Sequence, residues 1–365
     1  MSLVSVIIPT RNRATLLRQT IRSVLDQTWP DTEIIVVDEA SEDNTQAVLD
    51  DFGDRLDVVQ HETPKGPSVA RNVGVNNSSG EYVVFLDDDD LLHPRHVEEL
   101  IQFSEGLPLD HIAASGWRRF RISESGVEVG PVVRPPETWK EPEAVCAMFG
   151  HDPGCLVWGP SVLWPRSVVE EIQWDEDLYT NGDIDFYARI LGSGYTFVGT
   201  NAGMAYYRSH TGVSVSGKSA TNSESARSLV SGAKCRLKHS TRLRDHPKCD
   251  KFASAMREAL MRILVRLEAH GGLTSLARRV EREYKEWGGR PYFLPQPPQN
   301  WFKRHLLETS LSVGGPKTVG LLLRFQSKLS EAIDCEVSPN VEIIDYEFLI
   351  RQLVSAESAS ATPSK

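Results

Sequence analysis

The chain has 365 residues, of which 40% are hydrophobic and 25% are charged, a composition typical of a globular protein with one large domain or two. No apolar stretch approaches the roughly 20 residues of a membrane-spanning helix, and the N-terminus lacks the basic segment of a signal peptide. The five cysteines are scattered without zinc-ligand spacing. We therefore expect a reduced, cytoplasmic protein without a structural metal cluster.

The net charge of −10 is unevenly distributed. Residues 1–214 contain 16 Lys and Arg against 34 Asp and Glu, whereas residues 215–365 contain 24 against 16. An acidic first part is a poor ligand for nucleic acid, and the basic second part could face an anionic membrane, an acidic acceptor or the first part itself. The asymmetry predicts two units with different partners.

Strand and helix signals alternate over the first 90 residues. Short apolar runs predict strands, and apolar residues at helical spacing predict helices between them. Such alternation on short connections is typical of an α/β fold with a mainly parallel sheet flanked by helices on both faces. The expected strands are Val4–Ile8, Glu33–Val37, Leu56–Val59 and Glu81–Leu86, and the expected helices are Ala14–Gln27, Asn44–Phe52 and Ser68–Asn76.

Polar clusters follow three of these strands. They are Pro9-Thr10-Arg11-Asn12, Asp38-Glu39-Ala40-Ser41 and Asp87-Asp88-Asp89-Asp90. Ligands of such sheets bind outside the carboxyl ends of the strands, so the three clusters should meet at one edge. Four adjacent carboxylates repel one another unless a cation neutralises them, and hard carboxylate oxygens suit Mg²⁺ or Mn²⁺. An acidic loop exposed to solvent is the alternative interpretation.

The pattern becomes less regular after residue 90 and mostly helical after residue 215. Up to residue 215 we predict helices over His93–Phe103, Arg166–Ile172 and 181–191, short strands over Tyr195–Val198 and Ala205–Tyr207, and a loop over Gly126–Lys140. The segment Ile112–Ile122 is predicted to be either one long strand or a pair of strands. Further on we predict helices over Glu224–Arg242, Cys249–Ala269, Leu273–Trp287, Pro316–Ala332 and Ile343–Val354. The predicted organisation is a first domain over 1–215, a helical C-terminal region over 216–354 and a disordered tail over 355–365.

Several motifs of the first part occur in a familiar order. They are Val6-Ile7-Ile8-Pro9-Thr10-Arg11-Asn12, Ser23-Val24-Leu25-Asp26-Gln27-Thr28, Ile35-Val36-Val37-Asp38, Ala70-Arg71-Asn72, the segment from Gly80 to Asp90, and Asp183-Ile184-Asp185-Phe186. With these motifs, residues 3–214 resemble the inverting glycosyltransferases of family 2. The resemblance implies the GT-A nucleotide-sugar-binding fold.

The resemblance also implies roles for individual residues. Asp183 matches the catalytic base of the family, and Asp89, within the DxD motif, and His210 match positions near the Mn²⁺ or Mg²⁺ ion. The positions that match nucleotide-sugar contacts are Pro9, Thr10, Arg11, Asp38, Glu39, Arg71, Asp87 and Asp88. Three residues depart from the family pattern. Glu39 stands at the position of the base-contacting carboxylate, where its extra methylene moves the oxygen outward, Ala40 stands where Gly or Asn is usual, and Gly182 where Glu is usual. Glu39 and Gly182 are the residues that favour a catalytically silent protein.

Structural interpretations of the same residues stay open. Asp38 and Asp183 could cap helices, Arg71 could form a structural ion pair, and a lone histidine such as His210 is more often structural than a ligand. Asp185 is expected to make a structural or acceptor contact on its helix.

From these observations we predict a non-processive, metal-dependent, inverting glycosyltransferase that transfers a hexose from a nucleotide diphosphate sugar, with a UDP-sugar as the expected donor, to an acceptor hydroxyl in glycan, glycolipid or glycoconjugate synthesis, polysaccharide biosynthesis included. The acceptor could be a glycan, a lipid-linked molecule or a small molecule. For the helical region, an acceptor site, a homodimer interface and a docking surface for the inner membrane face stay open. A catalytically silent nucleotide-sugar-binding or carbohydrate-binding scaffold is the alternative. A nucleotidyltransferase or a dinucleotide oxidoreductase would need a glycine-rich loop after the first strand, where Pro9-Thr10-Arg11-Asn12 stands.

Overall fold

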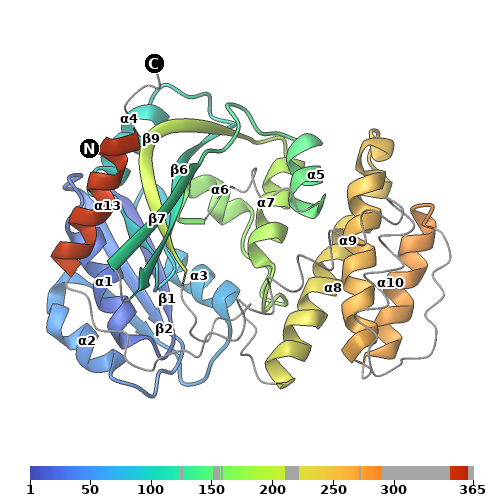
Figure 1. Cartoon of the computed structure of the whole chain (residues 1–365), viewed down its shortest axis with the longest axis horizontal. Coiled ribbons are helices and arrows are strands. Elements are labelled where there is room, and N and C mark those ends of the chain that lie inside the picture. The colour runs from blue at the N-terminus through green and yellow to red at the C-terminus, as the bar shows by residue number, and fades with distance from the viewer. Residues whose placement is uncertain are drawn as a thin grey trace. The chain divides into compact units, whose positions relative to one another are not determined.

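The computed structural model describes residues 1–123, 126–150, 157, 159–209, 222–270, 273–289 and 346–360 (Figure 1). The site position His210 and the helix expected over Pro316–Ala332 lie outside these residues. Within the described part of the chain, no helix is both long and apolar enough to span a bilayer.

A five-stranded sheet forms the first half of the fold, with the strand order β3-β2-β1-β4-β8. The first four strands are parallel, as predicted, and β8 runs antiparallel to β4. The strands are β1 (Val4–Thr10), β2 (Thr32–Asp38), β3 (Asp57–Gln60), β4 (Tyr82–Phe85) and β8 (Trp164–Pro165).

Helices cover both faces of this sheet. On β1, Ile8 belongs to a core with the apolar faces of α1 and α2, while the neighbouring Ile7 points to the other core, with α3, α6 and α7. This alternation explains why the strands are apolar at nearly every position. The helices are α1 (Ala14–Leu25), α2 (Thr45–Phe52), α3 (Pro67–Asn76), α6 (Arg166–Glu171) and α7 (Gly182–Gly192), with a 3-10 turn at Gly53–Arg55.

A second sheet has the order β5-β9-β6-β7. Its long strands β6 and β9 are parallel, and β5 and β7 pair with them in the antiparallel sense. The strands are β5 (Leu91–Leu92), β6 (His111–Ser123), β7 (Gly126–Val133) and β9 (Thr196–Arg208). Nearby lie α4 (His96–Ser104), α5 (Glu143–Gly150) and a 3-10 turn at Gly159–Ser161.

Two predictions for this region are wrong. The first eight residues of the expected loop Gly126–Lys140 form β7, an edge strand that tolerates Gly130 and Pro131 because its outer side needs no partner strand. The two short strands expected after residue 194 form the single strand β9. The register between β9 and β6 shifts between Ser115 and Gly116, and Gly203 takes a φ of 77° in the middle of β9. Because of this irregularity, the sequence of β9 has the pattern of two short strands.

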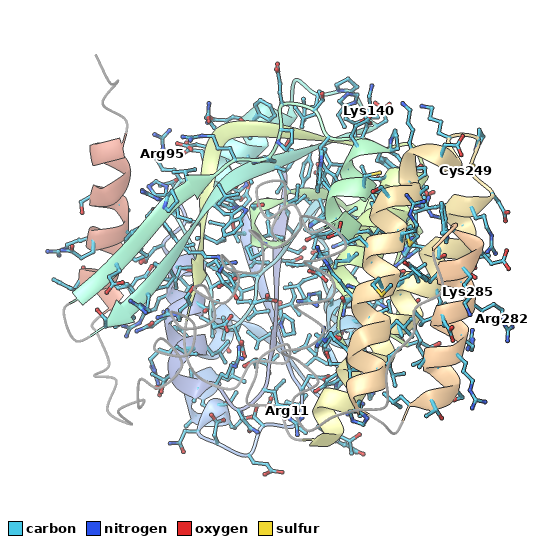
Figure 2. All side chains as sticks on the ribbon, turned by 45° about the vertical axis from the view of Figure 1, so that its right-hand side comes forward. Arg11, Arg95, Lys140, Cys249, Arg282 and Lys285 are labelled. Atoms are coloured by element: carbon cyan, nitrogen blue, oxygen red, sulfur yellow. The ribbon has the colours of Figure 1, made fainter. Side chains whose placement is uncertain are left out.

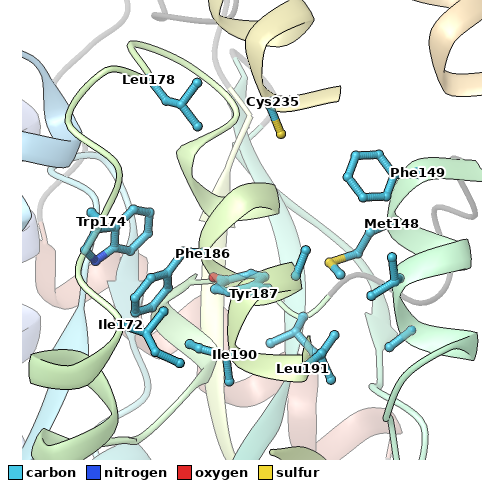
Figure 3. Close-up of a cluster of buried hydrophobic side chains, with 14 of the residues drawn as sticks. Met148, Phe149, Ile172, Trp174, Leu178, Phe186, Tyr187, Ile190, Leu191 and Cys235 are labelled. Atoms are coloured by element: carbon cyan, nitrogen blue, oxygen red, sulfur yellow. The ribbon is translucent and has the colours of Figure 1, made fainter. Parts of the chain in front are cut away.

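The helical region after residue 215 shares a core with the first sheet. The helices α8 (Asn222–Arg244), α9 (Cys249–His270) and α10 (Thr274–Glu286) pack side by side. Cys235 of α8 belongs to the same buried cluster as Phe149 of α5 and Phe186 of α7 (Figure 3). Burial of this continuous apolar cluster stabilises the sheet and the helices together.

The last described helix, α13 (Tyr346–Ser360), packs against the second sheet (Figure 1). Leu349 and Leu353 are fully buried and form a small core with Leu91, Phe120 and Tyr206. The helix continues to Ser360, within the segment 355–365 for which the composition predicts disorder.

Candidate active site

The carboxyl ends of β1, β2 and β4 meet at one edge of the first sheet, as predicted. The hydroxyl of Thr10 donates to Asp88 at 2.7 Å, and the backbone N–H of Arg11 points to the same oxygen at 3.4 Å. The backbone N–H of Glu39 donates to the carbonyl of Thr10 at 2.9 Å. Thr10 therefore ties the first polar cluster to the other two.

The four adjacent aspartates have different partners. Asp87 accepts a hydrogen bond from Arg71 at 2.7 Å. Asp88 and Asp89 both accept from Arg13, at 2.9 and 2.6 Å. Asp90 is fully buried and accepts from a backbone N–H of β9, so its contact serves the junction of the two sheets.

The pKa of the Asp88 carboxyl at this edge is shifted from its ordinary value. Burial raises the pKa of Asp88 to about 6, and the adjacent Asp89 charge adds to the rise although Arg13 opposes it. Burial would lower the pKa of Arg13, but the carboxylates of Asp88 and Asp89 more than offset this and raise it. The guanidinium thus supplies part of the positive charge that the cluster requires.

Arg71 of α3 is held between an acid and an aromatic ring. Its guanidinium contacts Asp87 on one side and lies 4.5 Å from the ring centroid of Trp174. This cation–π contact and the ion pair fix the orientation of the side chain. Arg71 therefore presents a fixed positive charge next to the aspartates.

Asp183 lies in the first turn of α7 and remains exposed to solvent. No side chain of the described residues pairs with it. The protein atoms around the site displace part of its hydration and raise its pKa, the nearby Arg71 charge lowers it and the Asp87 charge raises it again. The N-cap position of α7 is Asn181, so Asp183 does not serve as the cap. Asp183 is therefore a solvent-exposed carboxylate near the Arg71–Asp87 pair, without a side-chain partner among the described residues.

The loop after β2 uses its acids to hold its own backbone. Asp38 accepts from the backbone N–H of Ser41 at 3.1 Å and from its hydroxyl at 2.5 Å, and the N-cap of α2 is Asn44. Ala40 takes a φ of 55°, the left-handed region that favours Gly or Asn. This accounts for the residues usual at that position in the family that the sequence resembles.

Glu39 is buried and engages the loop that leads into α3. It accepts from the backbone N–H groups of Lys65 at 2.8 Å and Gly66 at 2.5 Å, and it pairs with His61. Both carboxylate oxygens thus have protein partners. A ligand that contacted Glu39 would have to share an oxygen with these donors.

Helix α8 holds the segment that carries Asp183. The hydroxyl of Ser231 donates to the carbonyl of Thr180 at 2.5 Å and accepts from its N–H at 3.0 Å. Arg236 donates to the side chain of Asn181 at 3.3 Å. Together these contacts fix the backbone just before α7.

Two residues beyond Asp183, Asp185 joins α7 to α8. Its fully buried carboxylate lies within 2.9 Å of Arg189, Lys238 and His239. Burial alone would raise the pKa of Asp185, but the hydrogen bond from His239 and the charge of Arg189 bring it below its ordinary value. The sequence allowed a structural or an acceptor role for Asp185, and its burial fits the structural one.

Asp185, Cys235 and His239 each offer a possible metal-ligand atom, and these atoms lie within 4.8 Å of one another. However, the carboxylate is already neutralised by Arg189 and Lys238. Burial also raises the pKa of Cys235 to about 12, which keeps the thiol protonated. We therefore assign this trio to the packing of α7 on α8.

Sequence reasoning missed Arg13, Trp174 and the α8 contacts. Arg13 precedes the first apolar residue of α1, and nothing in its local pattern indicates pairing with residues 75 positions away. Tryptophans more often fill cores, so the position of Trp174 in the sequence gives no sign of its contact with Arg71. The α8 contacts join segments about 50 residues apart, and polar residues on a helix give no signal of their partner.

Known proteins resemble this chain in sequence. The model of the family described as "Glycosyl transferase family 2" matches residues 5–130. The putative teichuronic acid biosynthesis glycosyltransferase TuaG of Bacillus subtilis is 30% identical over 210 residues, which cover 56% of this chain and 79% of TuaG. The poly(ribitol-phosphate) beta-N-acetylglucosaminyltransferase TarP of Staphylococcus aureus is 43% identical over 110 residues, which cover 29% of this chain and 34% of TarP.

Solved structures share the fold at low sequence identity. The crystal structure of S. aureus TarS 1-349 has a TM-score of 0.55 and 17% identity, and the match covers 78% of this chain and 80% of that one. The mannosyltransferase PcManGT of Pyrobaculum calidifontis, in complex with GDP-Man and Mn²⁺, has a TM-score of 0.50 and 16% identity over 98% of this chain and 86% of that one. The match to TuaG over 79% of its length, together with the family model over residues 5–130, shows that the chain belongs to glycosyltransferase family 2.

Proposed function

We propose that this protein is a metal-dependent, inverting glycosyltransferase that transfers a hexose from a UDP-sugar to an acceptor hydroxyl in glycan biosynthesis. The observation that carries the proposal is Asp183, an open carboxylate without a side-chain partner among the described residues, beside a group of acids that are paired. A raised pKa suits a general base, because it brings the proton affinity of the carboxylate closer to that of the reacting group.

In this mechanism Asp183 accepts the proton of the acceptor hydroxyl as its oxygen attacks the anomeric carbon. The attack comes from the face opposite the departing nucleoside diphosphate, so one displacement inverts the anomeric configuration. Arg71 is held rigidly by Asp87 and Trp174, and Arg11 is exposed at the end of β1. These two cations would bind the diphosphate and orient it for departure.

The aspartates at the end of β4 fit a divalent cation by their chemistry. Asp87, Asp88 and Asp89 carry three formal negative charges, and Arg13 and Arg71 bring two positive charges to them. Hard carboxylate oxygens with residual negative charge are the donor set that Mn²⁺ and Mg²⁺ take. When bound there, the ion would stabilise the charge that develops on the leaving diphosphate. The complex of PcManGT contains Mn²⁺, which supports this assignment.

The acceptor is proposed to be a growing glycan. TarP is named for transfer to poly(ribitol-phosphate), a polymer, and TuaG is named for teichuronic acid biosynthesis. Guanine is the alternative donor base, because the PcManGT complex contains GDP-Man.

The decisive experiment measures the release of nucleoside diphosphate from UDP-hexoses and GDP-hexoses in Mn²⁺, with and without acceptor. Asp183→Asn should reduce turnover at least 100-fold and leave the donor Kd unchanged. Asp177→Asn is the matched control, because Asp177 is an exposed acid of the preceding loop. Equal turnover of the two variants would remove Asp183 as the base, and no turnover by the wild type with any donor would favour the silent scaffold.

A further inference from the structure

The helical region carries a basic groove that the catalytic proposal does not use. Helices α8, α9 and α10 contain fourteen Lys and Arg against seven Asp and Glu. A groove of about 460 Å³ lies between α8 and α10. Four cations line it, Lys234 and Lys238 from α8 and Arg279 and Arg282 from α10. This volume falls within the range of sites that bind small ligands or segments of larger ones.

Most of this positive charge is not neutralised by the protein. Lys234, Arg279 and Arg282 are exposed and have no ion-pair partner among the described residues. Glu283, the acid in the lining, is engaged by Arg244 at 2.8 Å and by the hydroxyl of Ser240. Figure 2 shows Arg282 on α10 with its side chain directed away from the helix axis. The groove therefore offers several cationic donors to an anion.

The side chain of Lys238 connects α7, the helix that carries Asp183, to the groove. Lys238 lines it and reaches Asp185 of α7 at 2.9 Å, two residues beyond the proposed base. A ligand in the groove would contact α8 and α10, and Lys238 would connect it to α7 through its ion pair with Asp185. An acceptor polymer extends beyond the unit that reacts, and binding of its remote parts can position the reacting hydroxyl.

We propose that this groove binds a phosphate-bearing acceptor chain while its end enters the active site. The proposal rests on the proposed function and names the class of acceptor. Lys and Arg recognise phosphate oxygens by charge-assisted hydrogen bonds. An anionic membrane is the other polyanionic surface to consider. Helices that lie on membranes combine basic residues with exposed apolar ones, and none of the exposed large apolar side chains of the described residues lies on α8, α9 or α10.

The test uses fluorescently labelled inorganic polyphosphate as the probe and the full chain as the protein. The variant Lys234→Gln/Arg279→Gln/Arg282→Gln removes three cations from the groove. The matched control Lys248→Gln/Lys251→Gln/Arg278→Gln removes three exposed cations of the same region that do not line it. We expect at least tenfold weaker binding for the groove variant, less than twofold for the control, and a weaker salt dependence only for the groove variant.

Equal weakening in both variants, or no binding of polyphosphate by the wild type at 0.1 M salt, would overturn the proposal. Groove-dependent binding to vesicles of anionic phospholipid that exceeds binding to polyphosphate would also overturn it, in favour of a membrane. Hydrolysis of the sugar donor by water separates this proposal from the proposed function, because hydrolysis needs no acceptor. The groove variant should keep the wild-type hydrolysis rate, whereas Asp183→Asn should lose it and keep polyphosphate binding.

Discussion

The guanidinium of Arg13 lies 2.6 Å from Asp89, the residue that the sequence assigns to the metal. The same nitrogen lies 2.9 Å from Asp88, so one arginine at the start of α1 bridges both carboxylates. Arg13 and a divalent cation would thus compete for the same two acids.

Arg13→Gln should destabilise the metal-free protein by about 2 kcal/mol, because it leaves the buried Asp88 beside Asp89 without its cation. Added Mn²⁺ should raise the melting temperature of Arg13→Gln more than that of the wild type, since the ion no longer competes with the guanidinium. The control is Arg18→Gln, which breaks an exposed ion pair with Asp51. A Mn²⁺ shift that is the same in all three proteins would show that the ion does not bind these acids.

Ser231→Ala should reduce turnover about tenfold and leave the donor KM unchanged. The substitution removes both hydrogen bonds to Thr180, at 2.5 and 3.0 Å, and so loosens the segment that positions Asp183. Steady-state kinetics with a fixed acceptor measure this separation of kcat from KM. Ser275→Ala, at an exposed position of α10 that does not line the groove, is the control. An increase in the donor KM with unchanged kcat would contradict the positioning role.

Gly182→Glu, which restores the residue usual in the family, should lower both stability and turnover. A Cβ atom at this position would lie 2.8 Å from the hydroxyl of Ser68 and 3.5 Å from Trp174. Overpacking of this kind costs about 1–3 kcal/mol. Chemical denaturation of Gly182→Ala, Ser68→Ala and the double variant measures the coupling. The double variant should be more stable than the sum of the single effects, and strict additivity would mean that Ser68 is not the obstacle.

His96 should make the protein less stable in mild acid. Its side chain is fully buried, and burial lowers the pKa of His96 to about 3. Between pH 6.5 and pH 3 the unfolded chain binds a proton at this position that the folded chain does not, so stability is present above pH 6.5 and falls as the pH drops. From pH 7 to pH 5 the wild type should lose about 2 kcal/mol more than His96→Gln. Urea unfolding of both proteins and of His111→Gln checks this; equal losses in all three would remove His96 as the cause.

The first 90 residues could be predicted almost completely from the sequence. The strands β1, β2 and β4 are buried on both faces and therefore contain runs of apolar residues, and α1 presents Leu17, Ile21 and Val24 at helical spacing to the sheet. The meeting of the strand ends follows from the parallel order, and the bond between Thr10 and Asp88 confirms it.

Other elements lack such a local signal. The edge strand β7 is only half buried, so its composition follows the loop pattern set by Gly130 and Pro131. Helix α5 has a short, almost wholly apolar sequence without amphipathic spacing. The attachment of α8 to the segment before Asp183 depends on Ser231, a residue type whose sequence context does not reveal a partner. These features arise from contacts between distant segments.

The four adjacent aspartates Asp87–Asp90 bond to different elements of the fold, so a ligand that binds them can affect those elements. Asp87 connects to α3 through Arg71, Asp88 and Asp89 to the start of α1 through Arg13, and Asp90 to β9. A cation that captured Asp88 and Asp89 would release Arg13, the arginine that tethers the start of α1. Donor occupancy should therefore be detectable far from the sugar, as faster amide exchange in the opening turn of α1, which makes that turn a natural reporter of the loaded enzyme.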